Sequence, residues 1–421
     1  MLRSSRRNIG TLVSSSVTLL SRLQQTCRDY DLLAVVYIIF VASIFFVTSD
    51  IVSYRLYVWT VVPLAVLMAL PFAARTMLSS IILISAAVYL AAVGFWTYHS
   101  VQFPPHEVAG QMKFYARVSV QILSFLLVTA FLVATSPRFL EKFFVALCPI
   151  VALSALINMA IYAYSTPLPI PLVSYRLVAA IGTPRFTNST HISSTYALFL
   201  VGGLSILVAC QLSRVQRIVL QWSAPVLVAG ILMTQARGAI AAVVAGTLVA
   251  LAQRRTAQKK LILGLAAAFA VAMLIPALHE AILSRGQSYR LELWQRYLAM
   301  AAQAPFAGVG HFANIEIIMG DGAVLNQPHN VILWGQIRGG IVAAAAVAVM
   351  VAACIYWCWR HWRKNAAIVP LALVATMLVS GMVEVGLFPG YPTWPWVTYW
   401  LPVGISVAAE VLARAPAAAS A

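Results

Sequence analysis

The chain has 421 residues, of which 62% are hydrophobic and only 9% charged, and its formal net charge is +17. A soluble domain carries roughly 25% charged residues, so this composition excludes a soluble globular protein and predicts that lipid covers part of the apolar surface. The basic residues are scattered between apolar runs rather than gathered in one domain, which disfavours nucleic acid as a partner and favours membrane orientation and contact with anionic membrane lipids.

Residues 1–30 form a basic segment that lacks the pattern of a cleavable signal peptide. Its arginines alternate with aliphatic residues, which is typical of a helix lying on the cytoplasmic leaflet. A disordered tail is the alternative. We expect this segment on the cytoplasmic side; its arginines are Arg3, Arg6, Arg7, Arg22 and Arg28.

About twelve apolar runs follow, and a membrane-spanning helix needs about 20 such residues. They predict an all-α polytopic membrane protein with transmembrane helices 1–9 in residues 31–278, a loop at 279–329, transmembrane helices 10–12 in residues 330–412 and a tail at 413–421. The individual runs lie near residues 31–49, 54–72, 76–97, 117–135, 140–164, 191–211, 217–235, 238–253, 261–278, 331–357, 367–386 and 394–412.

The Lys and Arg residues of the loops predict the orientation of these helices. With the N-terminus inside, eighteen of the 28 basic residues fall on the cytoplasmic side and ten on the opposite side or its interface. This bias predicts an N-in, C-in topology, and it places the long loop at 279–329 outside the cytoplasm. A loop of this length in a compact protein is usually functional.

The middle of that loop, residues 288–303, is expected to form an amphipathic helix that ends before Pro305. Leu291, Trp294, Leu298 and Ala301 share one face at helical spacing. Glu292 and Arg296 have the i,i+4 spacing of a helical ion pair. The aromatic content of this helix suits a membrane–water interface.

Three arginines near the outer face are candidates for binding an anion. Arg237 lies where one span ends and the next begins, and the unpaired amides and dipole of a helix start favour an anion there. Arg285 and Arg290 flank a small flexible turn and could clamp a diphosphate from the aqueous side. The competing explanations are an interfacial arginine for Arg237 and solvent or lipid head-group contacts for the other two.

His329 lies at the outer mouth of the tenth span, directly after Pro328. Imidazole titrates near neutral pH, so His329 is a candidate general base; a structural histidine is the alternative. Arg338 follows nine residues later on the opposite helix face, and pairing with Glu384 is its alternative role.

Acidic residues are scarce on the expected outer side, and no DxD or paired-carboxylate motif occurs. This disfavours a divalent metal site and a two-carboxylate glycosidase, and no cofactor is indicated. The five cysteines form neither a disulfide framework nor a zinc-binding pattern. The apolar spans also lack the acidic chains expected of proton-coupled transporters, although a transporter or lipid flippase remains the competing class.

Five short stretches resemble, in order, the O-antigen ligase family within a ligase–polymerase superfamily of bacterial membrane glycosyltransferases. They cover roughly residues 180–345, about 40% of the chain. Each is weak alone, and their order around the long loop makes the resemblance specific. The stretches are Arg185-Phe-Thr-Asn188, Gln235-Ala-Arg-Gly238, Tyr289-Arg-Leu-Glu-Leu-Trp294, Pro305-Phe-Ala-Gly-Val-Gly310 and Pro328-His-Asn-Val-Ile-Leu333.

The resemblance implies a bacterial inner-membrane enzyme of the glycosyltransferase C type, with its active site facing the periplasm. The donor would be an O-antigen glycan on undecaprenyl diphosphate, and the acceptor would be the lipid A–core oligosaccharide. The transfer would be metal-independent and inverting. The family's outer arginines would correspond to Arg237 and to Arg285 or Arg290, and its histidine to His329.

The resemblance also marks Arg185, Asn330 and Arg338 as possible substrate-binding residues. O-antigen polymerases of the same superfamily share much of the pattern and are the alternative. Arg338-Gly339 after the histidine is more similar to ligases, because polymerases commonly carry an acidic residue nearby, where this chain has Gln336.

Overall fold

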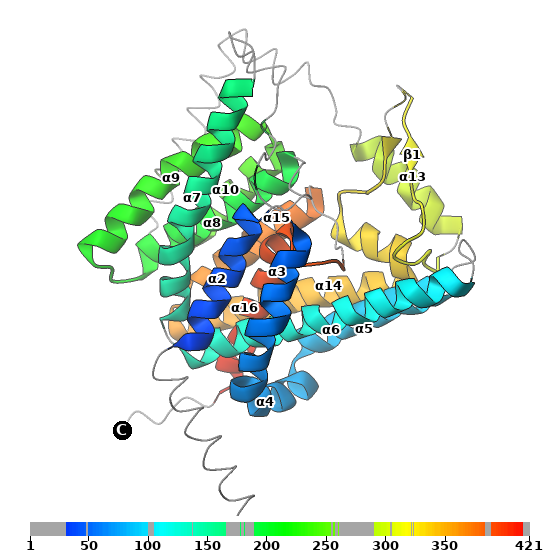
Figure 1. The fold of residues 1–421 in the computed structure, drawn as a ribbon, viewed down its shortest axis with the longest axis horizontal. Helices are drawn as coiled ribbons and strands as arrows, with labels where there is room; N and C mark the ends of the chain where they lie inside the picture. The colour runs from blue at the N-terminus through cyan, green and yellow to red at the C-terminus, as the bar shows by residue number, and fades with distance from the viewer. Residues whose placement is uncertain are drawn as a thin grey trace, which may run out of the picture.

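The structure, a computed structural model, describes residues 31–47, 49–99, 105–136, 138–165, 177, 181, 189–253, 256, 260, 290–303, 305–320, 322, 324–383 and 389–415. These residues form a bundle of helices with one small β-hairpin (Figure 1). The chain is therefore an all-α polytopic membrane protein, as its composition predicts.

The apolar runs of the sequence form long helices because the backbone groups of a membrane-spanning segment must pair within the segment. Eight helices of the described residues are long and apolar enough to cross a membrane. They are Asp50–Ser79 (α3, a π-helical turn at Tyr57–Val61, and α4), α5 (Ile81–Tyr98), α6 (Pro105–Thr135), α7 (Phe139–Ser165), α8 (Ser189–Ala209), α9 (Arg214–Thr234), α14 (Val331–Asn365) and Trp396–Arg414 (a π-helical turn and α16).

Three shorter apolar helices complete the described part of the bundle. They are α2 (Leu32–Phe46), α10 (Arg237–Ala250) and α15 (Val369–Val383). All of these helices lie at or near predicted spans, whereas the ninth predicted span, 261–278, lies outside the described residues, as do the segment 1–30 and the tail beyond residue 415.

The helices differ in how far their neighbours cover them. In the run Trp396–Arg414, 89% of the residues in the most apolar 18-residue stretch are buried inside the protein. In the run Asp50–Ser79, only 28% of the residues in the corresponding stretch are buried. The latter run exposes Trp59, Leu70 and Leu78. In an aqueous protein this surface would be unfavourable, but in a bilayer it is the surface that lipid covers.

The two ends of the bundle carry different structures. At one end, α14 begins beside α13 (Arg290–Gln303) and the hairpin of β1 (Ile317–Ile318) and β2 (Val324–Leu325). In Figure 1, α13 and β1 lie away from α4. We call the α13 end the loop end, and the end where α4, α6 and α16 finish the opposite end.

Helix α14 packs along α5 over much of its length and is interrupted at Gly340, where φ is 69°. A left-handed residue inside a helix is tolerated most readily when it is glycine. The predicted span 331–357 therefore corresponds to a short helical segment at the loop end, a break at Gly340, and a longer helix. This second helix extends past the predicted span to Asn365.

Candidate active site

Helix α14 begins with an N-cap that fixes the backbone next to His329. The side-chain oxygen of Asn330 accepts hydrogen bonds from the amides of Ile332 and Leu333, each at 3.0 Å. Asparagine is a preferred N-cap because its side chain satisfies amides that have no partner within the helix. Asn330 thus has a structural role, and its contact with substrate stays a prediction.

His329 has a left-handed backbone conformation, with φ 52°. This region is unfavourable for most residues by about 1–2 kcal/mol, although histidine enters it more often than most. The carbonyl of the preceding Pro328 accepts a hydrogen bond of 2.8 Å from the indole nitrogen of Trp294 in α13. The backbone that carries His329 is therefore fixed on both sides, by Trp294 and by the Asn330 cap.

The segment 305–313 lies directly against α14, and glycines allow this contact. The amides of Val309 and Gly310 donate to the carbonyls of Ile337 and Arg338 at 2.8 and 3.0 Å. A Cβ atom on Gly308 would lie 2.3 Å from the Arg338 carbonyl oxygen, and one on Gly340 would lie 2.3 Å from a backbone oxygen of Phe306. Two stretches that the sequence separates by about thirty residues thus dock backbone to backbone.

Arg338 holds the same segment with its side chain. Its Nη1 donates to the carbonyls of Gly310 at 2.9 Å and Ala313 at 2.7 Å, and its guanidinium lies 4.6 Å from the ring centre of Trp334. The residue is 6% exposed, so its charge is stabilised mainly by these carbonyls and the indole. Its Nε has no hydrogen-bond partner in the part of the chain that the structure describes.

The expected roles of Arg338 are modified by this geometry. Its main contacts in the described residues position the loop, whereas the predicted alternative partner, Glu384, lies outside the described residues. That Arg338 binds substrate stays a prediction, and such binding would use the guanidinium donors other than Nη1.

A cavity of about 570 Å³ opens beside Arg338, at the loop end. This volume lies within the range of small-molecule sites, about 300–1,000 Å³. Four parts of the chain bound it: the start of α8, the loop 312–327, the first turns of α14, and the segment before the π-helical turn at Trp396–Trp400. The lining residues are His191, Phe312, Ala313, Asn314, Ile315, Glu316, Asn326, Gln327, Trp334, Arg338, Gly390, Thr393, Trp394 and Pro395.

The lining of the cavity combines amides, one carboxylate and aromatic rings. Asn314, Asn326 and Gln327 offer both donors and acceptors, and the side-chain oxygen of Gln327 has no hydrogen-bond partner among the described residues. The ring of His191 stacks on Trp394 with a centroid distance of 4.0 Å and an interplanar angle of 16°. Such a lining suits a polar, neutral ligand with many hydroxyl groups. His329 is two residues from Gln327 and is not itself part of the lining.

The amphipathic helix of the loop is present as α13, Arg290–Gln303. Leu293 and Tyr297 are buried, whereas Leu291 and Leu298 are each 57% exposed. The side of α13 that carries Tyr297 packs on the loop that follows, where its hydroxyl donates to the carbonyl of Ile315 at 2.9 Å. Burial also raises the pKa of Tyr297 above its ordinary value, so it stays a neutral donor.

The predicted ion pair of α13 is confirmed, with Arg296 and Glu292 2.6 Å apart. Arg296 also donates to the carbonyl of Ile318 in β1 at 2.9 Å. This arginine therefore links α13 to the hairpin. Helix α13, the hairpin and the start of α14 are joined into one unit by Trp294, Arg296 and Tyr297.

Arg237 is the first residue of α10, and Arg290 is the first described residue of α13. The cap residue of α10, Ala236, offers no side-chain acceptor to the first amides, and Arg237 is exposed. This is the arrangement expected for an anion site at a helix start. Neither arginine lines the cavity of about 570 Å³.

Arg185 and Arg285 lie outside the described residues, so their predicted roles are untested. The structure adds His191 and Trp394, which sequence reasoning did not single out. A polar residue at the start of an apolar run is a weak signal for His191, but only tertiary structure places it on Trp394.

Comparison with known proteins finds similarity over part of the chain. A family model described as O-antigen ligase matches residues 222–348. An O-antigen ligase from Pseudomonas aeruginosa is 28% identical over 158 residues, which are 37% of this chain and 39% of that protein. The aligned part thus covers less than half of the relative's length.

Proposed function

Starting from the O-antigen ligase family domain at residues 222–348, we propose that the protein is a bacterial inner-membrane glycosyltransferase that ligates O-antigen to the lipid A–core oligosaccharide. The donor is a glycan carried on undecaprenyl diphosphate, and the reaction takes place at the periplasmic face. Because the relative is aligned over 39% of its length, its name supports the activity class and leaves both substrates to experiment.

The observation that supports this proposal best is the content of the matched segment. Residues 222–348 contain Arg237, Arg290, His329 and Arg338, and they include the glycine-dependent docking of residues 308–310 on α14. Several candidate groups of the sequence thus belong to one family domain, and Arg338 reaches a cavity whose polar and aromatic lining suits a sugar.

In this proposal the arginines bind the donor's leaving group, a lipid diphosphate. Arg237 contributes its guanidinium and the amides at the start of α10. Arg290, at the start of α13, and Arg285 contribute further positive charge. A guanidinium group can donate two parallel hydrogen bonds to phosphate oxygens. Such groups stabilise the negative charge that develops on the leaving diphosphate.

His329 serves as the general base. It removes the proton from the acceptor sugar hydroxyl as that oxygen forms a bond to the donor's anomeric carbon. The bond between this carbon and the diphosphate oxygen breaks in the same step, and the lipid diphosphate leaves. A single displacement of this kind inverts the configuration at the anomeric carbon.

We expect the transfer to be independent of divalent metals, because the arginines supply the positive charge that a metal supplies in other transferases. Activity should survive EDTA once the chelator's effect on lipopolysaccharide packing is controlled with a magnesium-saturated chelator. Loss of activity that one divalent ion alone restores would contradict this expectation.

The experiment that tests the proposal is reconstitution of the purified protein with the lipid-linked glycan and lipid A–core, followed by gel separation of the products. A ladder on lipid A–core supports the ligase. Longer chains that stay on undecaprenyl diphosphate would identify a polymerase instead. Movement of the intact donor across the bilayer without any new glycosidic bond would identify a flippase.

A further inference from the structure

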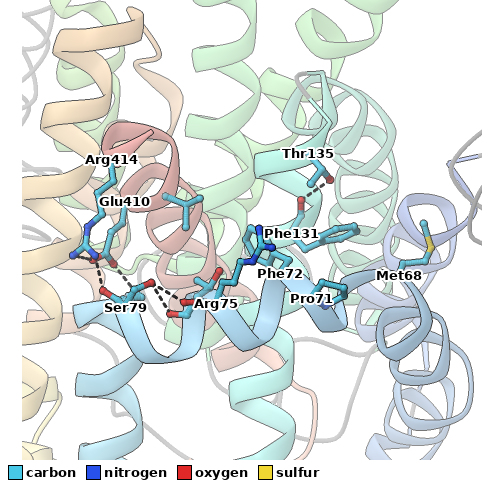
Figure 2. A pocket seen from close by; sticks show the side chains of 12 residues that line it. Met68, Pro71, Phe72, Arg75, Ser79, Phe131, Thr135, Glu410 and Arg414 are labelled. Atoms are coloured by element: carbon cyan, nitrogen blue, oxygen red, sulfur yellow. Dashed lines mark hydrogen bonds and ion pairs between the residues drawn. The ribbon is translucent and has the colours of Figure 1, made fainter. Parts of the chain in front are cut away.

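A hollow of about 500 Å³ lies at the opposite end of the bundle, between the ends of α4, α6 and α16 (Figure 2). One wall of it is apolar and includes Phe72 and Phe131. A neighbouring hollow of about 660 Å³ shares Met68, Phe131 and Thr135 with the first. The two hollows therefore adjoin, and we call them together the α4 groove.

The Glu410–Arg414 pair closes one end of the α4 groove, and both charges are already compensated. Glu410 is 1% exposed, and it accepts hydrogen bonds from the Ser80 hydroxyl at 2.5 Å and the Ile81 amide at 3.1 Å. Arg414 lies 2.6 Å from Glu410. This pair caps the start of α5 and gives the groove a fixed wall, as the dashed lines in Figure 2 show.

The cations at the other end of the α4 groove are also paired. Arg138 lies 2.8 Å from Glu141, and the pairing raises the pKa of Arg138 further above its ordinary value. Lys142 pairs with Asp31. These residues therefore add little net charge to the groove.

Arg75 is different, because it is the one cation of the α4 groove without a carboxylate partner among the described residues. It lies in the last turns of α4 and is exposed. In Figure 2 its side chain points from α4 toward Phe72 and Phe131, away from the Glu410–Arg414 pair. The α4 groove thus combines a long apolar wall with one uncompensated positive charge.

We propose that the α4 groove binds an anionic phospholipid, with the lipid phosphate at Arg75 and an acyl chain along Met68, Phe72 and Phe131. Around the groove, α4 exposes Leu70, Met77 and Leu78, which marks this side of the bundle as lipid-facing. An arginine near the end of a spanning helix reaches the head-group level, where phosphate is the available anion. The bias of basic loop residues assigns this end to the cytoplasmic leaflet, whose anionic lipids attract such cations.

The basic N-terminal segment of the same chain is a weaker candidate for this groove, because its arginines would repel Arg75. The proposal concerns the end of the bundle opposite His329. It therefore stands or fails independently of the transfer reaction.

Native mass spectrometry of the purified protein tests this proposal through the number of lipids retained. Phosphatidylglycerol and phosphatidylcholine are supplied in equal amounts to wild type, Arg75→Gln, Arg75→Lys and Arg55→Gln. Arg55 is the matched control, since it is an exposed arginine at the other end of the same helical run. One arginine near a membrane surface changes anionic-lipid affinity about five-fold. We therefore expect Arg75→Gln to retain about five-fold less phosphatidylglycerol, and the other two variants to resemble wild type.

Equal phosphatidylglycerol retention in all four proteins would overturn the proposal, as would equal retention of the two lipids by wild type. Cross-linking of wild type with a photoactivatable phosphatidylglycerol provides a test that needs no variant. Cross-links on α4 and α6 support the α4 groove, and cross-links confined to other helices overturn it. Displacement of the lipid by equimolar glycerol phosphate would show a site for a soluble anion instead of a phospholipid.

Discussion

His329 occupies a backbone conformation in which asparagine and glycine are more stable than most residues, and this allows its chemical and structural roles to be separated. A residue kept only to form the turn before the Asn330 cap should be replaceable by either. A residue that removes a proton should not be replaceable by them, because the asparagine amide is not a base and glycine has no side chain.

We predict that His329→Asn folds and binds donor like wild type but transfers glycan about 10²–10⁴-fold more slowly, the usual loss for a missing general base. The amide keeps hydrogen-bonding ability and tolerates the left-handed conformation. Thermal unfolding and donor-binding assays provide the control for folding. Near-normal transfer by well-folded His329→Asn or His329→Gln would refute the base assignment.

The role proposed for Arg237 depends on its forked guanidinium as well as its charge. Lysine keeps the charge and loses the paired hydrogen bonds to phosphate. We predict that Arg237→Lys weakens donor binding and that Arg237→Ala weakens it more, with thermal stability close to wild type because the side chain is exposed. Equal donor affinity in wild type and Arg237→Ala, measured by titration with the lipid-linked glycan, would contradict the role.

The residue types of the site were predictable from the sequence, but their partners were not. Arg338 was a candidate contact for substrate or Glu384, whereas the structure directs its Nη1 to the Gly310 and Ala313 carbonyls. Backbone carbonyls leave no pattern in a sequence. For the same reason the stacking of His191 on Trp394, about two hundred residues apart in the chain, could not be foreseen.

At the scale of elements, the docking of residues 308–310 on α14 determines the shape of the loop end. Backbone hydrogen bonds and the Arg338 side chain hold this segment, and the absence of a Cβ at Gly308 permits the approach. The same segment leads into one wall of the cavity of about 570 Å³.

We predict that Gly308→Ala destabilises the protein by about 1–3 kcal/mol, the usual cost of overpacking, and impairs transfer. Its Cβ would lie 2.3 Å from the Arg338 carbonyl oxygen, which is too close for any rotamer change to relieve. Gly320→Ala is the matched control in the same loop, since a Cβ there meets nothing within 4 Å. Thermal unfolding in detergent gives the midpoint of each variant. Equal midpoints for the two variants would contradict the close contact of Gly308 with α14.

Sequence patterns predicted the elements well where hydrophobicity alone decides them. The spans near 191–211 and 217–235 correspond to α8 and α9. Periodicity predicted the amphipathic helix α13, but it could not predict the contact of Tyr297 with the Ile315 carbonyl in the loop that follows. The break of α14 at Gly340 was also not predicted; a Cβ atom there would meet the backbone of Phe306, a contact that the sequence does not reveal.

At the scale of the whole molecule, the central expectation is that the loop end faces the periplasm and the opposite end faces the cytoplasm. This expectation follows from the N-in, C-in topology that the basic loop residues predict. The fold alone does not say which end of the bundle faces the cytoplasm. That assignment comes from the distribution of the basic residues.

We predict that cysteines introduced at positions 254–260 and in the last turns of α14, at positions 360–364, resist impermeant thiol reagents in intact cells, and that a cysteine at position 320 reacts. The five native cysteines are replaced first, and labelling in permeabilised cells controls for access. The reverse pattern would invert the topology and move the proposed site to the cytoplasmic side.

Transfer of a glycan from a lipid diphosphate to a separate acceptor is the central claim, and release of undecaprenyl diphosphate by the purified protein measures it most directly. We predict release only when lipid A–core is present, with one lipid diphosphate freed for each glycan that becomes attached. The His329→Asn protein should reduce release and attachment together. Release that is equally fast without lipid A–core, or no release with both substrates present, would contradict the ligase assignment.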